Sequence, residues 1–329
     1  MRPGRPALLL LLTTACGAPC QTARSEPPPV TQPPRTTLPP STPPAPEVGS
    51  EASGTSEGSG DCVRYADPIR RGELPPVLDE ASGLTSSRWS ADRLWAHNDS
   101  GDEARLFAID RSGSLQATVT LDGAKAKDWE DIARGPCGPA DAARSCLYIA
   151  DIGDNKEKRE KVRFYRFPEP ETLTAEMTIT RFETMELRYP DGPLNAEAMF
   201  VDEAGRLVIL SKEEDRTRIF VAPFAPGDPV TAMQVGERKL SGGNLFVREL
   251  VTAADFDATR RRVAFRTYHH AYEWRLPAGA GAEQLGALEP VALPLALETQ
   301  GEAIAYLPGG LVTTSETAGS PLFFYDCRP

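Results

Sequence analysis

One position of a repeated motif carries a carboxylate in four of its five copies. The residues at this position are Glu80, Glu130, Glu197, Thr252 and Glu302. Carboxylates that converge in a narrow space repel one another unless some take up protons or a cation neutralises them. Oxygen ligands without histidine or cysteine suit a hard cation, Ca²⁺ above all. The four glutamates therefore predict a calcium site. The alternative is that each glutamate caps backbone N–H groups of its own repeat.

Further oxygen donors follow in the loops of the first two repeats. Asp99-Ser-Gly-Asp and Asp151-Ile-Gly-Asp have the same spacing, and Asn98 and Asn155 stand beside them. Asp99 and Asp151 are predicted as additional metal ligands, and the two asparagines as ligand-binding residues. The motif lacks the remaining positions of an EF-hand loop, so an Asx-turn is the simpler interpretation and the one we favour.

Two cationic residues stand at the ends of β-rich runs in the third and fourth repeats. Lys212 follows Leu207-Val-Ile-Leu-Ser, and Arg266 follows Arg262-Val-Ala-Phe. Together with Thr252 and the acidic residues they are predicted to bind an anionic, metal-bridged group such as phosphate. A solvated charge is the alternative for each. The sequence contains no Gly-x-Ser-x-Gly elbow beside a histidine, so no catalytic residue is assigned.

These residues belong to a hairpin that recurs five times. In the third copy, Glu197-Ala-Met-Phe-Val is a strand, a turn follows, and Leu207-Val-Ile-Leu is a second strand. The anchors lie 50, 67, 55 and 50 residues apart (130−80, 197−130, 252−197 and 302−252). Such a period predicts an all-β fold, a β-propeller of five blades with four antiparallel strands each. A sixth blade stays open, hidden in the longest interval or before Glu80.

The cysteines predict how the ring closes. Cys62 precedes the first strand and Cys327 follows the last, and a propeller is closed by pairing strands from its two termini. An exported chain permits disulfides, so we expect a Cys62–Cys327 bond, worth roughly 4–5 kcal/mol in the chain-entropy model. Cys137 and Cys146 flank one loop of the second repeat and are predicted to staple it.

The first residues predict export. Arg2 and Arg5 form a positive region before an apolar run at residues 7–12, which is too short to span a bilayer. The residues around Cys16 are similar to a bacterial lipobox, so Cys16 is the predicted lipidation site. Cleavage of an ordinary signal peptide after Ala15 or Ala18 is the alternative.

Composition divides the chain into three parts. Residues 1–15 are the predicted signal peptide, residues 16–61 form a Pro-, Thr-, Ser- and Gly-rich linker, and residues 62–329 hold the propeller. We therefore expect a monomer of the bacterial cell envelope, on the periplasmic or outer-surface side, that meets the membrane through its lipid anchor only. The net charge of −11 argues against nucleic acid as a partner, because phosphate neutralisation needs clustered Lys and Arg.

Five short strings together resemble a known group of exported propellers. They are Glu80-Ala-Ser-Gly-Leu, Leu94-Trp-Ala-His-Asn-Asp-Ser-Gly, Asp128-Trp-Glu-Asp-Ile-Ala, Asp151-Ile-Gly-Asp-Asn and Asn195-Ala-Glu-Ala-Met. The group is related to the SdiA-regulated and esterase-like phytase families, and the likeness covers residues 78–316. It implies a Ca²⁺-compatible propeller and, in some members, ester or phosphoester hydrolysis.

Two functions are compatible with these observations. The first is an envelope-anchored binding or scaffold propeller with an acidic, cation-stabilised channel mouth and an unidentified small-molecule or protein ligand. The second is a Ca²⁺-dependent ester or phosphoester hydrolase, in which the metal polarises the ester and a ring glutamate activates water. We favour the first, because no nucleophile–base constellation is visible and a propeller fold alone implies no activity.

Overall fold

The computed structural model describes residues 62–214, 216–240 and 249–329, which all lie in the compact unit Gly58–Pro329. The predicted signal peptide, the lipidation site Cys16 and the linker lie outside the described residues, so these remain predictions. Among the described residues, no helix has the length and apolar character needed to cross a membrane.

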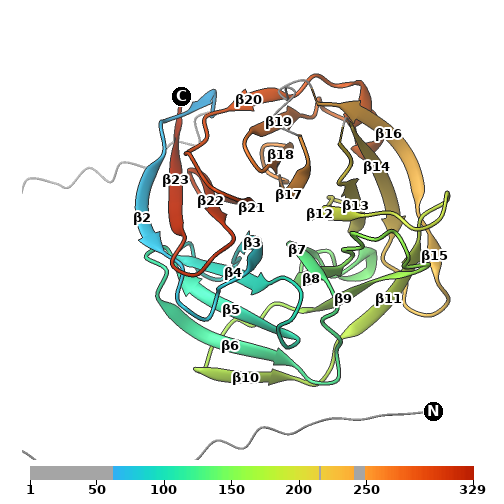
Figure 1. Cartoon of the computed structure of the whole chain (residues 1–329), viewed down its shortest axis with the longest axis horizontal. Helices are drawn as coiled ribbons and strands as arrows, with labels where there is room; N and C mark the ends of the chain where they lie inside the picture. Colours follow the sequence, from blue (N-terminus) through green and yellow to red (C-terminus); the bar gives the residue numbers. More distant parts are fainter. Residues whose placement is uncertain (1–61, 215, 241–248) are drawn as a thin grey trace, which may run out of the picture. The chain divides into compact units, whose positions relative to one another are not determined.

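Five small sheets are arranged as the blades of a propeller around a central axis, the channel axis (Figure 1). The inner strands neighbour one another in order around the ring, and the last lies beside the first. They are β3 (Ala81–Ser86), β7 (Trp129–Pro136), β12 (Ala196–Val201), β17 (Val251–Asp257) and β21 (Gly301–Leu307). The predicted five-bladed propeller is confirmed.

Three further layers of strands lie outward from the channel. The second strands are β4 (Arg93–Asn98), β8 (Ser145–Asp151), β13 (Arg206–Ser211), β18 (Arg262–Thr267) and β22 (Gly310–Ser315). The third strands are β5 (Arg105–Asp110), β9 (Val162–Pro168), β14 (Arg216–Pro223), β19 (Ala271–Arg275) and β23 (Pro321–Arg328). The fourth strands of the first four blades are β6 (Leu115–Leu121), β11 (Glu183–Arg188), β16 (Met233–Lys239) and β20 (Val291–Leu293).

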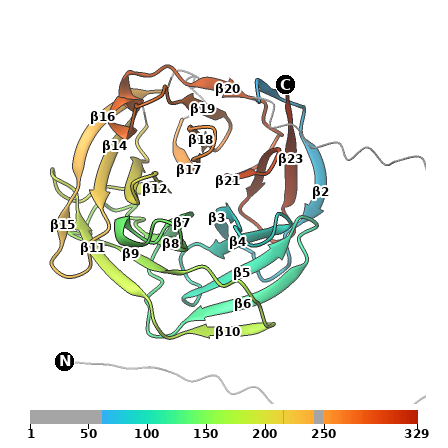
Figure 2. The ribbon, with the colours of Figure 1, turned by 180° about the vertical axis from the view of Figure 1, so that it is seen from behind.

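Strands from the two ends of the domain complete the fifth blade. β1 (Arg64–Tyr65) and β2 (Ile69–Glu73) both pair antiparallel with β23, and Figure 2 shows the C-terminus beside β2. Cys62 and Cys327 form a disulfide with a Cα–Cα distance of 5.3 Å. A second disulfide joins Cys137 to Cys146. Both predicted pairs, and the predicted closure by terminal strands, are confirmed.

Two sheets carry a fifth, parallel strand that the four-stranded prediction omitted. β10 (Glu176–Ile179) leaves the second blade and pairs with β6 of the first, and β15 (Val230–Thr231) pairs with β11 of the second. The excursion to β10 lengthens the interval between Glu130 and Glu197, so no sixth blade is needed to explain it. Two short 3₁₀ turns, η1 (Pro139–Asp141) and η2 (Ala282–Ala287), complete the described elements.

The hydrophobic core is divided among the five blade interfaces, with one apolar cluster between each pair of neighbouring blades. Trp95 of the first blade and Trp129 of the second are both fully buried in one such cluster. Phe265 and Trp274 stack at 4.1 Å between ring centroids in another. Because both faces of a sheet are covered by neighbours, strands such as Leu207–Leu210 read as continuous apolar runs, not as alternating ones.

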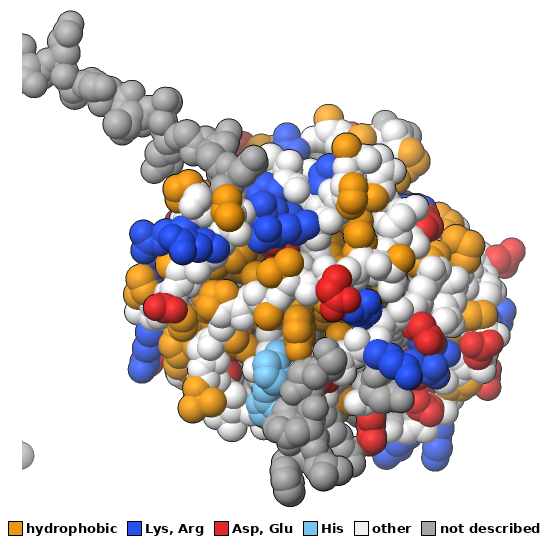
Figure 3. Space-filling model, turned by 90° about the horizontal axis from the view of Figure 1, so that it is seen from above, with side chains coloured by type: hydrophobic (Ala, Val, Ile, Leu, Met, Phe, Trp, Pro, Cys, Tyr) orange, Lys and Arg blue, Asp and Glu red, His pale blue; other side chains and the backbone are white. Residues whose placement is uncertain are grey.

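Charged side chains of both signs are distributed over the outer surface. Figure 3 shows one side of the molecule, where Lys and Arg side chains lie in small groups among acidic, hydrophobic and uncharged ones. Many of these charges are paired at the surface, as in Arg71 with Asp326 at 2.8 Å. Exposed pairs of this kind contribute little to stability.

Candidate functional site

Every inner strand has an irregularity at its entrance. In each blade the pairing of the inner strand with the second strand shifts register by one residue, so one residue of the inner strand is left unpaired. The unpaired residues are Ser82, Glu130, Glu197, Thr252 and Glu302. A β-bulge of this kind re-aims a side chain and is over-represented next to functional sites. The bulges therefore set which side chains face one mouth of the channel.

The bulge positions correct the sequence alignment of the first repeat. Ser82, not Glu80, is equivalent to Glu130. Glu80 lies one residue before β3 and is exposed; its backbone N–H donates to Asn98 Oδ1 at 3.3 Å. The string beginning at Glu80 looks like the other repeats, but strand pairing decides the register, and a shift of two residues moves the carboxylate out of the ring.

Two of the five bulge residues join blades together through their hydroxyl groups. Ser82 Oγ donates to the carbonyl of Glu130 at 2.7 Å, and Thr252 Oγ1 donates to the carbonyl of Gly301 at 2.7 Å. Both side chains are buried. Thr252, predicted as a ligand-binding residue, therefore has a structural partner in the next blade.

The three bulge glutamates gather with two aspartates from neighbouring loops. We call these five residues the acidic mouth: Asp99, Asp128, Glu130, Glu197 and Glu302. One carboxylate oxygen each from Asp99, Asp128 and Glu130 lie within 4.8 Å of one another. The three glutamates are buried, whereas Asp99 and Asp128 are half-buried. The predicted residues Asp99, Glu130, Glu197 and Glu302 thus lie in one region.

Burial and mutual repulsion raise the pKa values of these carboxyl groups. Burial, and then the charges of Glu197 and Asp99, raise the pKa of Glu130 well above its usual range. The pKa of Asp99 rises to about 7, chiefly through burial. Burial and then the charge of Glu197 raise the pKa of Glu302 to about 8. The acidic mouth is therefore an environment in which protons or a cation relieve an unfavourable concentration of negative charge.

Gly153 makes room for two of the carboxylates. A Cβ atom at this position would lie 1.9 Å from Glu130 Oε1 and 2.6 Å from Asp128 Oδ2. Neighbouring Asp151 supports the same wall, since its Oδ1 accepts the backbone N–H of Asp128 at 3.2 Å and pairs with Arg159 at 2.8 Å. Asp151, predicted as a metal ligand, thus acts through the position of Asp128.

The two predicted asparagines occupy different environments. Asn98 is buried, and its side-chain amide donates to Val77 O and to Asp102 Oδ2, each at 2.9 Å. Asn155 is exposed and accepts a hydrogen bond from Asn195 at 3.2 Å. The Asn98–Asp102 bond lies within one loop, whereas Val77 and Asn195 are distant in the sequence, so both asparagines tie their loops to other segments.

Lys212 and Arg266 are not equivalent, contrary to the sequence alignment. Lys212 pairs with Glu197 of the acidic mouth and donates to the Tyr268 hydroxyl at 2.6 Å. In the fourth blade, Thr267 takes the register position that Ser211 has in the third, so Arg266 lies one residue further inside the strand. Lys212 follows Ser211 and lies outside its strand, so Arg266 stands two positions before the equivalent of Lys212 and, unlike Lys212, within the strand.

Arg266 is consequently enclosed between the fourth and fifth blades. Its guanidinium pairs with Glu298 at 2.8 Å and donates to the carbonyls of Ala303 and Thr314 at 3.1 and 3.2 Å. The side chain is fully buried. A cation held by these partners joins two blades, whereas Lys212 is the basic side chain paired to a carboxylate of the acidic mouth.

Two further buried polar groups lie between the blades. His97 is fully buried, its Nδ1–H donates to Asn98 O at 2.8 Å, and burial lowers its pKa to about 4. Asp131 accepts three backbone N–H groups, from Met199 at 2.8 Å, Ile132 at 2.9 Å and Ala254 at 3.1 Å. The carboxylate of Asp131 thereby ties the inner strands of three blades together.

Two of these roles were missed from the sequence. Asp128 is not among the ligands predicted from the sequence, although its place two positions before the anchor Glu130 is a local signal for it. No local signal marks Asp131, because its N–H partners on Met199 and Ala254 are distant in the sequence. The acidic mouth has the donor set and spacing to bind a divalent cation.

Comparisons with known proteins concern the fold of this chain and not its function. No family model matches the chain, and no curated protein matches it. Virginiamycin B lyase from Staphylococcus aureus has 11% sequence identity and a TM-score of 0.38, with 75% of this chain and 66% of the lyase covered. Luciferin-regenerating enzyme has 9% identity and a TM-score of 0.41, with 79% and 95% covered. A calcium-binding protein, regucalcin, from Agrobacterium tumefaciens has 12% identity and a TM-score of 0.43, with 80% and 96% covered. None of them names the SdiA-regulated or phytase families, and no function is transferred from them.

Proposed function

We propose that this protein is an exported, lipid-anchored binding or scaffold propeller whose acidic mouth holds Ca²⁺. The observation that carries the proposal is the group formed by Asp99, Asp128 and Glu130, whose carboxylate oxygens lie within 4.8 Å of one another. Two oxygens that bind one Ca²⁺ at about 2.3–2.6 Å can be at most about 5 Å apart. The measured spacing fits this limit.

The chemistry of the donor set supports the same ion. The ligand atoms are all carboxylate oxygens, which suit a hard cation. Glu197 and Glu302 add negative charge, while Lys212 balances one carboxylate. Gly153 leaves the space that the side chains of Asp128 and Glu130 need. When bound, Ca²⁺ would offset the repulsion that otherwise raises the pKa values of these groups.

Export and anchoring belong to the same proposal. Two disulfides are expected in an oxidising compartment. With the signal peptide at residues 1–15, lipidation at Cys16 and a linker to residue 61, the propeller would be displayed at a distance from the membrane. Its ligand would then be a small molecule or protein of the cell envelope.

Calorimetric unfolding in Ca²⁺ and in chelator tests the metal. At a Ca²⁺ concentration one hundred times the dissociation constant, the free energy of unfolding should rise by about 2.7 kcal/mol. We expect a higher melting temperature in Ca²⁺ than in EGTA, and a smaller effect of Mg²⁺, which demands tighter octahedral geometry. Identical melting curves in Ca²⁺ and EGTA would remove calcium from the proposal.

Membrane fractionation tests the anchor. Cys16→Ser should release the protein from the membrane to the soluble fraction, because the lipid is the proposed membrane contact. Cys20→Ser is the matched control and should leave the protein with the membranes. If Cys16→Ser fractionates like the wild type, lipidation at Cys16 is wrong while the propeller and its cation site are unaffected.

A metal-dependent hydrolase is the second candidate. The observation that favours it is Lys212, a cation beside the acidic mouth that could help to hold an anionic ester next to a metal. Lys212 is already paired with Glu197, and His97 is buried between the first two blades, so we rank this function second. Turnover of p-nitrophenyl acetate or p-nitrophenyl phosphate that disappears in EGTA and in Lys212→Met would reverse this ranking.

A further inference from the structure

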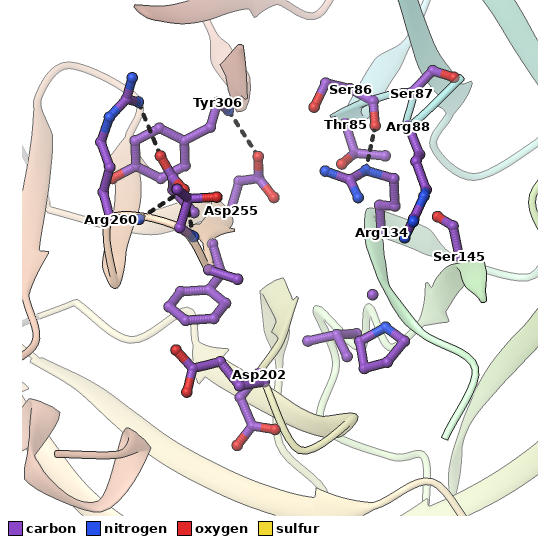
Figure 4. Close-up of a pocket in the computed structure, with 18 of the residues that line it drawn as sticks. Thr85, Ser86, Ser87, Arg88, Arg134, Ser145, Asp202, Asp255, Arg260 and Tyr306 are labelled. Atoms are coloured by element: carbon purple, nitrogen blue, oxygen red, sulfur yellow. Dashed lines mark hydrogen bonds and ion pairs between the residues drawn. The ribbon is translucent and has the colours of Figure 1, made fainter. Parts of the chain in front are cut away.

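The mouth opposite the acidic one opens into a large cavity. Its lining includes the last residues of all five inner strands, whereas the bulges of the acidic mouth stand at the first residues of these strands. The cavity has a volume of about 920 Å³, which is within the range of small-molecule sites. Figure 4 shows Thr85, Ser86, Arg88 and Arg134 on one side and Asp255, Arg260 and Tyr306 across from them. We call this cavity the arginine pocket.

Carboxylates of the arginine pocket have partners. Asp257 pairs with Arg260 at 2.9 Å, and Asp202 pairs with Arg206 at 2.7 Å. Glu203 pairs with Arg261. Buried Asp255 accepts the backbone N–H of Tyr306 at 2.7 Å. These acidic groups are therefore already occupied and do not create a demand for a cation.

Two arginines on the other side are left over. Among the residues that the structure describes, neither Arg88 nor Arg134 has a carboxylate at ion-pair distance, and the charge of Arg134 acts on Asp255 only from further away. Arg134 donates its Nε–H to the carbonyl of Ser86 at 2.8 Å, which orients the guanidinium group. Arg144 adds a third guanidinium, whose contact with Asp141 is long, at 3.9 Å. This side of the pocket therefore has an excess of positive charge.

The side of the pocket that carries Arg88 and Arg134 is fixed by hydrogen bonds to Glu169. Glu169 accepts the backbone N–H of Arg88 at 3.1 Å, the Ser145 hydroxyl at 2.8 Å and the Trp95 indole N–H at 3.0 Å. Its carboxylate is buried and links the first two blades. A wall that is fixed before binding loses little conformational entropy when a ligand arrives. The hydroxyls of Thr85 and Ser86 lie on the same wall.

The rest of the lining is partly apolar. Val201, Phe256 and Leu307 come from the ends of three other inner strands, and Pro136 is the last residue of the strand that carries Arg134. A pocket with an apolar surface and a few convergent polar groups selects a ligand with a matching division. A purely inorganic ion would leave this apolar surface unused.

We propose that the arginine pocket binds an organic anion, with its carboxylate or phosphate group between Arg88 and Arg134 and its apolar body against Phe256 and Leu307. Guanidinium groups bind the paired oxygens of both anions in bidentate geometry, and neighbouring hydroxyls add donors. The site is distinct from the acidic mouth and needs no metal.

Isothermal titration calorimetry with phenyl phosphate, benzoate and phenol tests the proposal, with EGTA present throughout. Phenyl phosphate and benzoate share their aromatic ring with phenol, so the difference in affinity between the anions and phenol measures the contribution of the charged group. We expect one-to-one binding of at least one anion by the wild type, and no measurable binding of phenol. Arg134→Gln and Arg88→Gln should each raise the dissociation constant at least tenfold, and the double variant should lose binding.

The control variant is Arg188→Gln, which removes the same charge from an exposed position on β11. It should bind like the wild type. Arg88→Gln keeps the test valid if Arg134→Gln folds poorly, because the exposed Arg88 side chain contributes little to packing. The proposal is overturned if neither anion binds the wild type at about 10 mM, a concentration at which even a weak site fills. Equal affinity of wild type and both variants, or binding of phenol as tight as that of the anions, would overturn it as well.

Discussion

The two mouths of the propeller have excess charge of opposite sign. At the acidic mouth, three buried glutamates and two aspartates lie together, Lys212 pairs with Glu197, and the pKa values of Glu130 and Glu302 rise. At the arginine pocket, Asp257 and Asp202 each pair with an arginine, and Arg88 and Arg134 have no carboxylate at ion-pair distance in the part of the chain that the structure describes. One end of the channel therefore favours a cation and the other an anion.

Between the two mouths, a buried carboxylate has a third kind of environment. Asp131 is fully buried like Glu130, yet it accepts three backbone N–H groups, whereas Glu130 faces other carboxylates. Burial raises the pKa values of both carboxyl groups, but the backbone donors act against this rise at Asp131, whereas neighbouring negative charges add to it at Glu130. Burial by itself thus does not identify a ligand site. The partners of the carboxylate separate a structural role from a binding role.

The largest effect that this comparison predicts is at Asp131. Asp131→Ala would orphan three buried N–H groups on three blades, at about 1–3 kcal/mol each, so we expect a loss of about 3 kcal/mol or more in the free energy of unfolding. Urea denaturation measures it. Asp131→Asn keeps one acceptor oxygen and should lose less. A loss below about 1 kcal/mol in Asp131→Ala would show that this carboxylate is not a structural clamp.

A second prediction concerns the acidic mouth in the presence and absence of metal. Asp128→Asn with Glu130→Gln should abolish the Ca²⁺ stabilisation of about 2.7 kcal/mol, while stability in EGTA stays equal or rises because repulsion is removed. Gly153→Ala should also abolish it, since the added Cβ occupies the space of the two carboxylates. Calorimetry in Ca²⁺ and in EGTA measures both.

Glu80→Gln is the matched control for that experiment. It removes the same charge from an exposed residue outside the ring of bulges, so the Ca²⁺ response should be unchanged. A reduced Ca²⁺ response in Glu80→Gln, together with a normal response in Asp128→Asn with Glu130→Gln, would show that Glu80 is a ligand, as the sequence alignment predicts.

The smallest predicted effect is the pH dependence of stability that Asp255 contributes at the arginine pocket. Burial raises the pKa of Asp255 to about 7 in the folded protein, above its unfolded value of 3.8. The folded state then binds more protons than the unfolded state, so stability falls as the pH rises and levels off above pH 7. The loss from pH 6 to pH 8 should be about 1 kcal/mol.

Asp99 and Glu302 shift stability in the same direction, so the measurement is a difference. Urea unfolding of wild type and Asp255→Asn is compared at pH 6 and pH 8 in EGTA. The amide still accepts the Tyr306 N–H but does not titrate, so Asp255→Asn should lose about 1 kcal/mol less stability over this range. Parallel pH profiles would show that the Asp255 carboxylate keeps an ordinary pKa.

Much of the architecture could be predicted from local sequence. The recurring hairpin gave the five blades, because a repeat of that length with short strands buries its faces only by stacking into a ring. Cys62 and Cys327 at the two ends of the domain predicted closure, and their disulfide confirms it. Glu130, Glu197 and Glu302 were found for the same reason, since equivalent positions of a closed ring converge on one axis.

Strand register and ring closure decided the rest. Glu80 resembles its counterparts but lies two residues before the bulge, and Arg266 lies one residue before the position equivalent to Ser211. The offset of two residues places Glu80 outside its strand, and the offset of one residue turns Arg266 to the other face of its sheet, because side chains alternate between faces with a period of two residues. The arginine pocket likewise joins Arg88 to Phe256 and Leu307, which only the closed ring brings to one mouth of the channel.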